Sequence, residues 1–454
     1  MTTAFPRLSA ADLTNLAVEA ADTPMHVGLL AILDGRSLSD AGARLRLAAI
    51  RVEIDARLTG VPELRRIVHR AGLLGGAPLW VDDPAFRIDR HVHQVVLPPP
   101  ADEGALLRLA EDLMAPTLDR IHPMWRIWFV TGLPGHQVAA VIALHHAIAD
   151  GLGAVQLLTA LLHPASTAEP RPWAPSVPPR WRTLAHDNVR VKLTTARRLI
   201  RVPHPHRLVA SVLGGWRGLT RAWHAPRTSL TGPIGPRRQI AVLRLDLATV
   251  SQVAHDHDAK VNDVVLDLAA GGLRALLLSR AESVDRLAVH AAVAASPHTD
   301  TPAPRTGNRA GIIIVNLPLD EPDPSARLRL ICLDSARAKR EQLLTTEQGM
   351  LVWLARLGLL RRYTRRQHLT NIAESSVIGP PTPILLLGAP VTDMIPIGAL
   401  AGNLAISFLA FSYAGRLSIA IRADADLHPD LSVLADAMAQ DWQALTSASQ
   451  PARA

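Results

Sequence analysis

A pair of histidines followed by an Asp-Gly turn is the feature that most constrains how this chain folds. His145 and His146 come directly after the apolar, β-branched run 138–144, which predicts a buried strand. Asp150 and Gly151 then predict a sharp turn that opens into an apolar helix. The pattern therefore predicts a rigid strand that holds an imidazole at the mouth of a cleft.

An imidazole in that position is suited to general base catalysis. The unperturbed pKa of histidine is about 6.5, so the neutral form is the main one at pH 7. A strand end also keeps the ring within reach of the proton that it removes. Because neighbouring strand residues face opposite sides, His145 and His146 are not expected to ligate one metal ion. The alternative is that both histidines are packing residues in a core strand.

Several further motifs resemble the bacterial wax ester synthase/diacylglycerol acyltransferase family. Residues 118–120 and 123–125 resemble its Leu-Asp-Arg and Pro-Leu-Trp signatures, with Met124 in place of Leu. Residues 375–380 resemble its Ser-Asn-Val-x-Gly-Pro segment, with Ser376 in place of Asn. The other matching segments are 8–12, 23–28, 261–266, 272–274, 307–309, 317–319, 323–328, 412–415 and 424–430. Many short motifs in one order are far more specific than any single motif.

The resemblance implies an α/β fold with mixed sheets, in which two chloramphenicol-acetyltransferase-like lobes form a central tunnel. We expect an N-terminal lobe with the histidine motif over residues 1–163 and a C-terminal lobe over residues 239–454. A proline-rich linker and a basic amphipathic helical region would lie between them, over residues 164–238. Strand patterns occur at 27–32, 92–97, 138–144, 239–245, 288–294, 311–315, 384–387 and 417–421.

The activity implied by the resemblance is acyl-CoA-dependent O-acyl transfer. The acceptor would be the hydroxyl of a long-chain alcohol, giving a wax ester, or of a diacylglycerol, giving a triacylglycerol. His146 would be the general base and His145 a supporting residue, while Asp150 would be structural and paired with an arginine beside the Gly151 turn. Acyl-CoA would be a substrate, and no cofactor or metal is expected. The chain has no Walker-type or dinucleotide-binding glycine motif.

Substrate contacts are expected from three further residues. The Asn262 amide would donate to the developing oxyanion or orient the acceptor, the alternative being an N-cap of the helix over residues 263–278. Trp125 and Ser376 are secondary candidates, and core packing is the alternative for Trp125. The departures at Met124 and Ser376 leave open a specialised metabolite as acceptor. A non-catalytic lipid-binding relative is the remaining alternative.

Basic residues are concentrated in one part of a chain whose net charge is +8. Residues 171–240 hold 14 Lys or Arg against one acid, Asp187, and residues 351–369 repeat this basic and apolar pattern. A solvated surface, or helices whose apolar stripe faces the core, are the plain alternatives. The interleaved apolar residues also suit an anionic lipid surface, which predicts peripheral membrane or lipid-droplet association. No nucleic-acid-binding module is recognisable.

The expected location is cytoplasmic, with association at the inner face of the membrane or at lipid inclusions as the extension of that hypothesis. Cys332 is the only cysteine, so an internal disulfide is impossible, which suits a reducing compartment. The sequence indicates neither a membrane-spanning segment nor an export signal.

Overall fold

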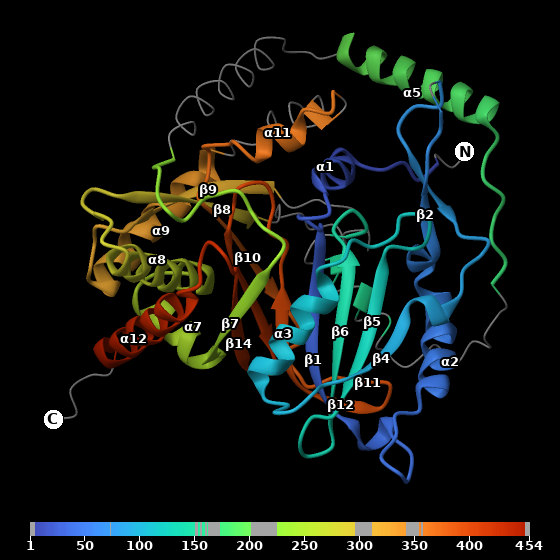
Figure 1. Ribbon diagram of the computed structural model, residues 1–454. Helices are drawn as coiled ribbons and strands as arrows, with labels where there is room; N and C mark the ends of the chain where they lie inside the picture. The colour runs from blue at the N-terminus through green and yellow to red at the C-terminus, as the bar shows by residue number, and fades with distance from the viewer. Residues whose placement is uncertain are drawn as a thin grey trace.

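Two six-stranded mixed sheets form the body of the molecule (Figure 1). The computed structural model describes residues 5–72, 74–149, 153–154, 157–158, 161, 173–200, 225–295, 311–341, 354–355 and 357–449. Within these residues each sheet is flanked by helices and has its own hydrophobic core. The expected α/β fold of two lobes is confirmed, whereas the central tunnel stays a prediction.

The first sheet carries the histidine pair. Its strands, in spatial order, are β11 (Leu385–Leu386), β12 (Ala389–Ile397), β1 (His26–Asp34), β6 (Gln137–His145), β5 (Trp125–Thr131) and β4 (Val92–Val96). Strand β6 is paired on both sides and, apart from Gln137, buried along its whole length. This burial explains the unbroken apolar run before His145, because a strand covered on both faces has no polar alternation.

The second sheet supports the C-terminal half. Its strands, in spatial order, are β7 (Arg238–Asp246), β14 (Arg416–Asp424), β13 (Ile406–Tyr413), β10 (Ile372–Ile378), β8 (Ala288–Ala295) and β9 (Gly311–Pro318). A separate hairpin joins β2 (Arg66–His69) to β3 (Leu79–Asp82). The strands predicted around residues 27, 92, 138, 239, 288, 311 and 417 are therefore present, while that at 384–387 is reduced to β11.

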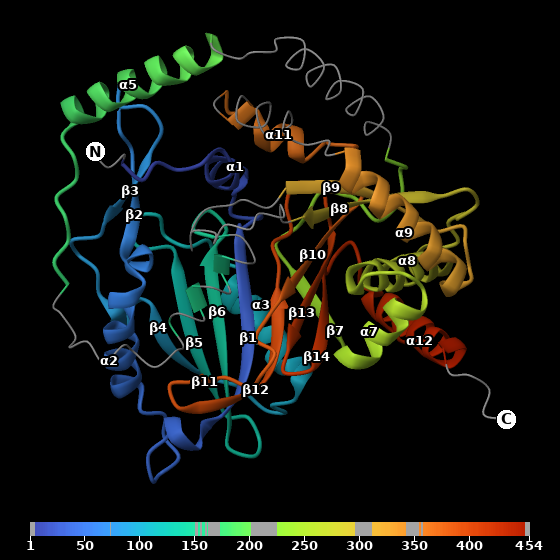
Figure 2. The ribbon, with the colours of Figure 1, turned by 180° about the vertical axis from the view of Figure 1, so that it is seen from behind.

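The helices lie around the two sheets, and one of them lies between the sheets. They are α1 (Ala10–Val18), α2 (Leu47–Arg57), α3 (Glu103–Met114), α5 (Trp181–Ile200), α7 (Leu247–Asp256), α8 (Val261–Ser279), α9 (Pro324–Glu341), α11 (Leu360–Thr364) and α12 (Leu431–Ser449), with short 3-10 turns at Gly35–Leu38, Leu58–Gly60, Pro62–Arg65 and Ile88–Arg90. Helices α7, α8, α9 and α12 gather beside the second sheet, and α2 lies on the opposite side of the molecule (Figures 1 and 2). Among the described residues no helix is long and apolar enough to cross a bilayer.

Helix α8 is the buried centre of the second lobe. Its side chains are apolar on nearly all sides, as expected for a helix surrounded by protein. The fully buried Arg327 of α9 ties the helices together. Its Nε donates to Asp267 of α8 at 2.8 Å, and its Nη2 donates to Asp441 of α12 at 2.5 Å.

The C-terminal half returns a strand to the first sheet. Strand β12 pairs antiparallel with β1, with Gly28 opposite Ile397 and Leu33 opposite Val391. Strands β11 and β12 fall inside the expected C-terminal lobe of residues 239–454 but belong to the sheet that carries His145. A single division of the chain at residue 239 therefore does not describe how the two lobes are built.

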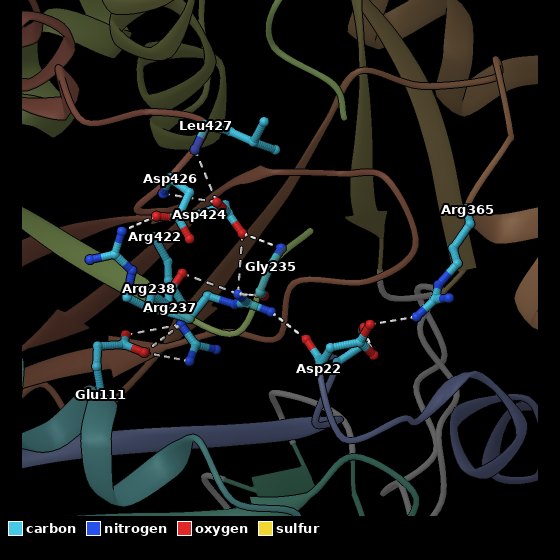
Figure 3. A network of polar contacts seen from close by, with 11 residues as sticks. Asp22, Glu111, Gly235, Arg237, Arg238, Arg365, Arg422, Asp424, Asp426 and Leu427 are labelled. Carbon is cyan, nitrogen blue, oxygen red and sulfur yellow. Dashed lines mark hydrogen bonds and ion pairs between the residues drawn. The ribbon is translucent and has the colours of Figure 1, made fainter. Parts of the chain in front are cut away.

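Helix α3 fills the space between the two sheets. Its apolar residues pack against β1 and β6 of the first sheet and against Ile240, Val242 and Ala420 of the second. At the edge of this shared core, the Arg422 guanidinium donates to both carboxylate oxygens of Glu111, the shortest contact being 2.6 Å (Figure 3). Both side chains are almost fully buried. The lobes therefore share an apolar core and a buried ion pair.

Candidate active site

The two histidines lie where β6 ends. His145 is the last residue of β6 and lies opposite His26 of β1 in the antiparallel register. Helix α1 lies beyond this end of the two strands (Figures 1 and 2). The backbone N–H of His146 donates to the carbonyl of Met25 at 2.8 Å, so the chain is still held against the segment leading into β1 as it leaves the strand.

His145 is fully buried and its ring is fixed from both sides. The N–H of Ala147 donates to its Nδ1 at 2.9 Å, so a neutral ring carries its proton on Nε2. Nε2 lies 3.2 Å from Oε1 of Glu19. Burial opposes ionisation of Glu19, but hydrogen bonds and charge interactions with His145 and Arg120 outweigh it and lower the pKa of this carboxyl to about 2.

Two residues of the sequence motifs complete this buried network. Arg120 donates to Oε2 of Glu19 through Nε at 3.1 Å and Nη2 at 2.7 Å. The His26 ring meets His145 edge-on with centroids 6.2 Å apart. Burial, with the charge of His145 as a further cause, lowers the pKa of His26 to about 4, so this ring is neutral at pH 7. The network holds His145 in place but leaves it no access to solvent.

His146 is half-buried and contacts α1 instead. The Nδ2 atom of Asn15 lies 3.2 Å from Nδ1 of His146 and also donates to the His146 carbonyl at 3.2 Å. If the amide donates to Nδ1, a neutral ring carries its proton on Nε2. Turning the amide over would leave Nε2 the lone pair that a base needs, but it would also replace the donor to the His146 carbonyl by an oxygen. Asn15 therefore sets the orientation of the ring and takes part in choosing its tautomer.

Helix α1 is positioned by a capping box. The Ser9 side chain accepts from the N–H of Asp12 at 3.1 Å, and the Asp12 carboxylate accepts from the N–H of Ser9 at 2.8 Å. This explains the Ser-x-x-Asp pattern in the motif over residues 8–12, because the helix that begins there carries Asn15 and leads into Glu19. Close packing also explains Gly28, where a Cβ atom would lie 2.7 Å from the carbonyl oxygen of Ile142.

Trp125 lies in the core of the first lobe. Its exposure is 3%, its Nε1 donates to the carbonyl of Leu64 at 2.6 Å, and the His91 ring stacks on it at 4.5 Å between centroids. Core packing accounts for these contacts. Met124, which replaces the leucine of the family signature, is also buried.

Asn262 and Ser376 meet at one carboxyl group in the second lobe. The Asn262 Nδ2 donates to Oε2 of Glu374 at 3.4 Å, and the Ser376 hydroxyl donates to Oε1 at 2.7 Å. The expected alternative for Asn262, an N-cap, is wrong, because Lys260 is the N-cap and α8 already begins at Val261. The oxygen of the Asn262 amide is buried without a hydrogen-bond partner in the described part of the chain.

The remaining predicted residues, Asp150 and Gly151, lie outside the described residues, and with them the arginine partner expected for Asp150. The sequence analysis gave no role to Asn15, Glu19 or Glu374. Of the residues in this network, Arg120 and His26 lie in motifs that the sequence analysis singled out, but those motifs were given no function. Within the described ranges no group of three or more His, Cys, Asp and Glu side chains is placed to hold a metal ion.

Solved structures identify the class of fold. A wax ester synthase/diacylglycerol acyltransferase from Marinobacter aquaeolei matches with a TM-score of 0.68 and 21% identity, covering 98% of this chain and 99% of that chain. A starter condensation domain of rhizomide synthetase, determined in complex with C8-CoA and Leu-SNAC, matches with a TM-score of 0.60 and 12% identity, covering 99% and 95%. At these identities the likeness concerns the fold, which is the two-lobed fold shared by wax ester synthases and condensation domains.

Sequence comparison gives the family. The model of the wax ester synthase/diacylglycerol acyltransferase catalytic domain matches residues 8–265, and that of the family's C-terminal domain matches residues 306–446. Relatives from Mycobacterium tuberculosis and Mycobacterium bovis, both named as diacylglycerol O-acyltransferases, are 30% identical over 92% of this chain and 91% of theirs. The chain belongs to the wax ester synthase/diacylglycerol acyltransferase family and is an acyltransferase.

Proposed function

We propose that the chain transfers an acyl group from acyl-CoA to the hydroxyl of a long-chain alcohol or a diacylglycerol, with His146 as the general base. The observation that carries the proposal is the half-buried His146 ring, held by Asn15 at the end of a rigid strand in a family of acyltransferases. His145, fully buried against Glu19, is the supporting residue. Acyl-CoA is a substrate here, and no cofactor is invoked.

The proposed reaction is a single acyl transfer. His146 takes the proton of the acceptor hydroxyl as its oxygen attacks the thioester carbonyl, and the C–S bond breaks when the tetrahedral intermediate collapses. The imidazolium then returns the proton to the leaving thiolate, so the base is regenerated. General base catalysis of this kind contributes roughly 10²–10⁴ in rate, and alignment of the two bound substrates contributes much of the rest.

The state of Asn262 supports a role in binding the acceptor. One amide hydrogen is engaged by Glu374, while the buried amide oxygen lacks a partner among the described residues. An unpaired acceptor of this kind is suited to a hydroxyl group, which can donate to it. Of the two roles expected for Asn262, orientation of the acceptor is therefore the one that we propose, with Ser376 beside it.

The proposal is tested with purified protein, palmitoyl-CoA and a panel of acceptors: hexadecanol, a diacylglycerol and small hydroxylated metabolites. Release of the CoA thiol together with ester formation is the expected result. His146→Ala should lower turnover at least about a hundredfold with little change in melting temperature, whereas His145→Ala should act mainly by lowering stability.

Two outcomes decide against this assignment. A folded His145→Ala variant that loses as much turnover as His146→Ala contradicts the division of roles. Wild-type protein that binds lipids but releases no thiol with any acceptor is instead a non-catalytic lipid-binding relative. Ester formation with small metabolites alone would identify the specialised acyltransferase that the departures at Met124 and Ser376 left open.

We also propose that the protein is cytoplasmic and docks on the surface of membranes or lipid droplets. Support comes from α5, which bears Arg182 and Lys192 and also exposes Trp181, Val189 and Leu193 to solvent. A helix with basic and apolar side chains on its open face is suited to an anionic lipid surface. No partner protein or nucleic acid is required by this proposal.

A further inference from the structure

A strongly basic pocket lies between α1 and α11, next to the histidine pair. Its volume is about 700 Å³, and its charged lining consists of five arginines and one carboxylate: Arg120, Arg361, Arg362, Arg365, Arg366 and Glu19. We call it the α1–α11 pocket. Nearly all basic residues of this chain are arginines, so the choice of Arg over Lys at these positions says nothing about a ligand. The convergence of five arginines on one cavity, in contrast, is a property of the fold.

Three of these arginines are available to a ligand. Arg120 is paired with Glu19, and Arg365 with Asp22 at 2.5 Å (Figure 3). Arg361, Arg362 and Arg366 are exposed and form no ion pair within the part of the chain that the structure describes. Guanidinium groups crowded into one cavity repel each other, and an anion with several oxygens removes this repulsion by accepting paired hydrogen bonds.

The pocket and the candidate active site share one wall. Glu19 faces the pocket while its Oε1 lies 3.2 Å from His145. Leu16 and Ala17 also line the pocket, and they directly follow Asn15, which holds the His146 ring. A ligand whose anionic end lies in the pocket would therefore have its other end directed past α1 toward His146.

We infer that the α1–α11 pocket binds the phosphate groups of the acyl-CoA donor, through Arg361, Arg362 and Arg366. The inference rests on the proposed acyl-CoA-dependent function. Coenzyme A carries a diphosphate and a ribose phosphate, separated from its thioester by the pantetheine arm, so its charge and its reacting carbonyl occupy different places. A phospholipid headgroup offers the same phosphate chemistry, and the experiment distinguishes these two sources.

The test compares two donors that share an acyl group but not the phosphates. Palmitoyl-CoA and the palmitoyl thioester of N-acetylcysteamine are supplied to the wild type and to the double variant Arg361→Ala/Arg362→Ala. The ratio of kcat/KM for palmitoyl-CoA to that for the phosphate-free thioester should fall at least about tenfold in the variant, mainly through KM. Arg44→Ala/Arg108→Ala removes two exposed arginines outside the pocket lining and should leave the ratio unchanged.

Binding measurements keep this inference separate from the proposed function. By calorimetry, adenosine 3′,5′-bisphosphate should bind the wild type and the Arg44/Arg108 control, and at least about tenfold more weakly the Arg361/Arg362 variant. Bisphosphate binding can be measured even if neither thioester supports acyl transfer. Absence of transfer with both thioesters would contradict the proposed function but not the pocket assignment. An unchanged ratio together with unchanged bisphosphate binding overturns the pocket assignment. The assignment is also overturned if the Arg361/Arg362 variant loses binding to phosphatidylglycerol vesicles but still binds the bisphosphate, since the pocket would then bind a lipid headgroup.

Discussion

Glu374 connects the two residues of the second lobe that the sequence marked as substrate contacts. It is 2% exposed and accepts from Ser376 and Asn262. Burial raises the pKa of this carboxyl to about 7, although both hydrogen bonds act in the opposite direction. A serine at position 376 thus has a clear contact, because its hydroxyl reaches the acid that also holds Asn262.

The raised pKa makes stability depend on pH in a defined direction. The folded protein retains the Glu374 proton up to about pH 7, whereas the unfolded chain loses it near pH 4.5. The stabilisation is therefore complete below pH 4.5 and is lost as the pH rises to about 7, by an amount on the order of 3 kcal/mol. Glu374→Gln should remove this loss and be more stable than the wild type at pH 8.

Urea unfolding of both proteins from pH 4.5 to 8 measures the effect, and the difference between the curves isolates Glu374 from the other titrating groups. Asp112→Asn, at an exposed carboxyl, is the matched control and should follow the wild type. If the Glu374→Gln and wild-type curves stay parallel over this range, the carboxyl does not titrate with a raised pKa.

Among the individual residues of the candidate site, the sequence predicted the histidine pair but not the side chains that contact it. His145 and His146 are marked by their position after an apolar run, which is a local signal. Glu19 and Asn15 lie more than 120 residues earlier, and nothing local distinguishes them from other residues of an amphipathic helix end. Their roles follow from α1 lying at the end of β6, which is tertiary information.

Among the elements, the strands that the sequence did not predict are β2, β3, β5, β10, β12 and β13, and two of these carry local signals against a strand. Strand β10 contains the buried Glu374, and β12 contains Asp393, Pro390 and Pro396. Partners distant in the sequence compensate these charges, as Arg244 does by donating to Asp393 at 2.8 Å. Periodicity alone could not anticipate this compensation, whereas β6 and β1 needed none.

Helix α5 shows which part of the basic region has a free apolar surface. Leu184 is buried in a small cluster with Ala71, Leu79 and Val81, and Asp187 pairs with Arg7 at 2.7 Å. The helix is therefore anchored by one face to the β2–β3 hairpin, as Figure 1 shows, while Trp181 and Leu193 remain exposed at 61% and 54%. The alternative in which the apolar stripe faces the core holds for Leu184 but not for these two residues.

We expect the protein to bind phosphatidylglycerol vesicles more strongly than phosphatidylcholine vesicles, and raised salt to weaken that binding. Trp181→Ser/Leu193→Ser should bind anionic vesicles at least about fivefold more weakly because apolar contact is lost. Co-sedimentation measures both effects. The control Val52→Ser/Ile378→Ser removes exposed apolar side chains elsewhere. Equal binding to both lipids at low salt, or an equal loss in the control, would contradict docking through α5.

For the whole molecule, the structure shows two lobes that are interlocked. Strand β12 belongs to the first sheet, although along the chain it falls between β10 and β13 of the second sheet. Helix α3 packs against both sheets. Motifs in the sequence predicted two lobes but not this exchange, since the pairing of β12 with β1 joins residues 358 to 369 positions apart. We therefore expect the lobes to unfold together, with the buried contact between Glu111 and Arg422 contributing to their association.

That contact gives the prediction for the whole molecule. Glu111→Leu leaves the Arg422 guanidinium buried without its carboxylate and should cost about 3–5 kcal/mol in unfolding free energy. Glu111→Leu/Arg422→Met replaces both charges by apolar groups of similar size and should regain part of this loss. The recovery stays incomplete because Arg422 also donates to the carbonyl of Gly398, which the double variant leaves unpaired. Urea unfolding of the wild type, the two single variants and the double variant gives the coupling free energy between the two side chains. A double variant no more stable than Glu111→Leu would show that the unpaired Arg422 is not the source of the lost stability.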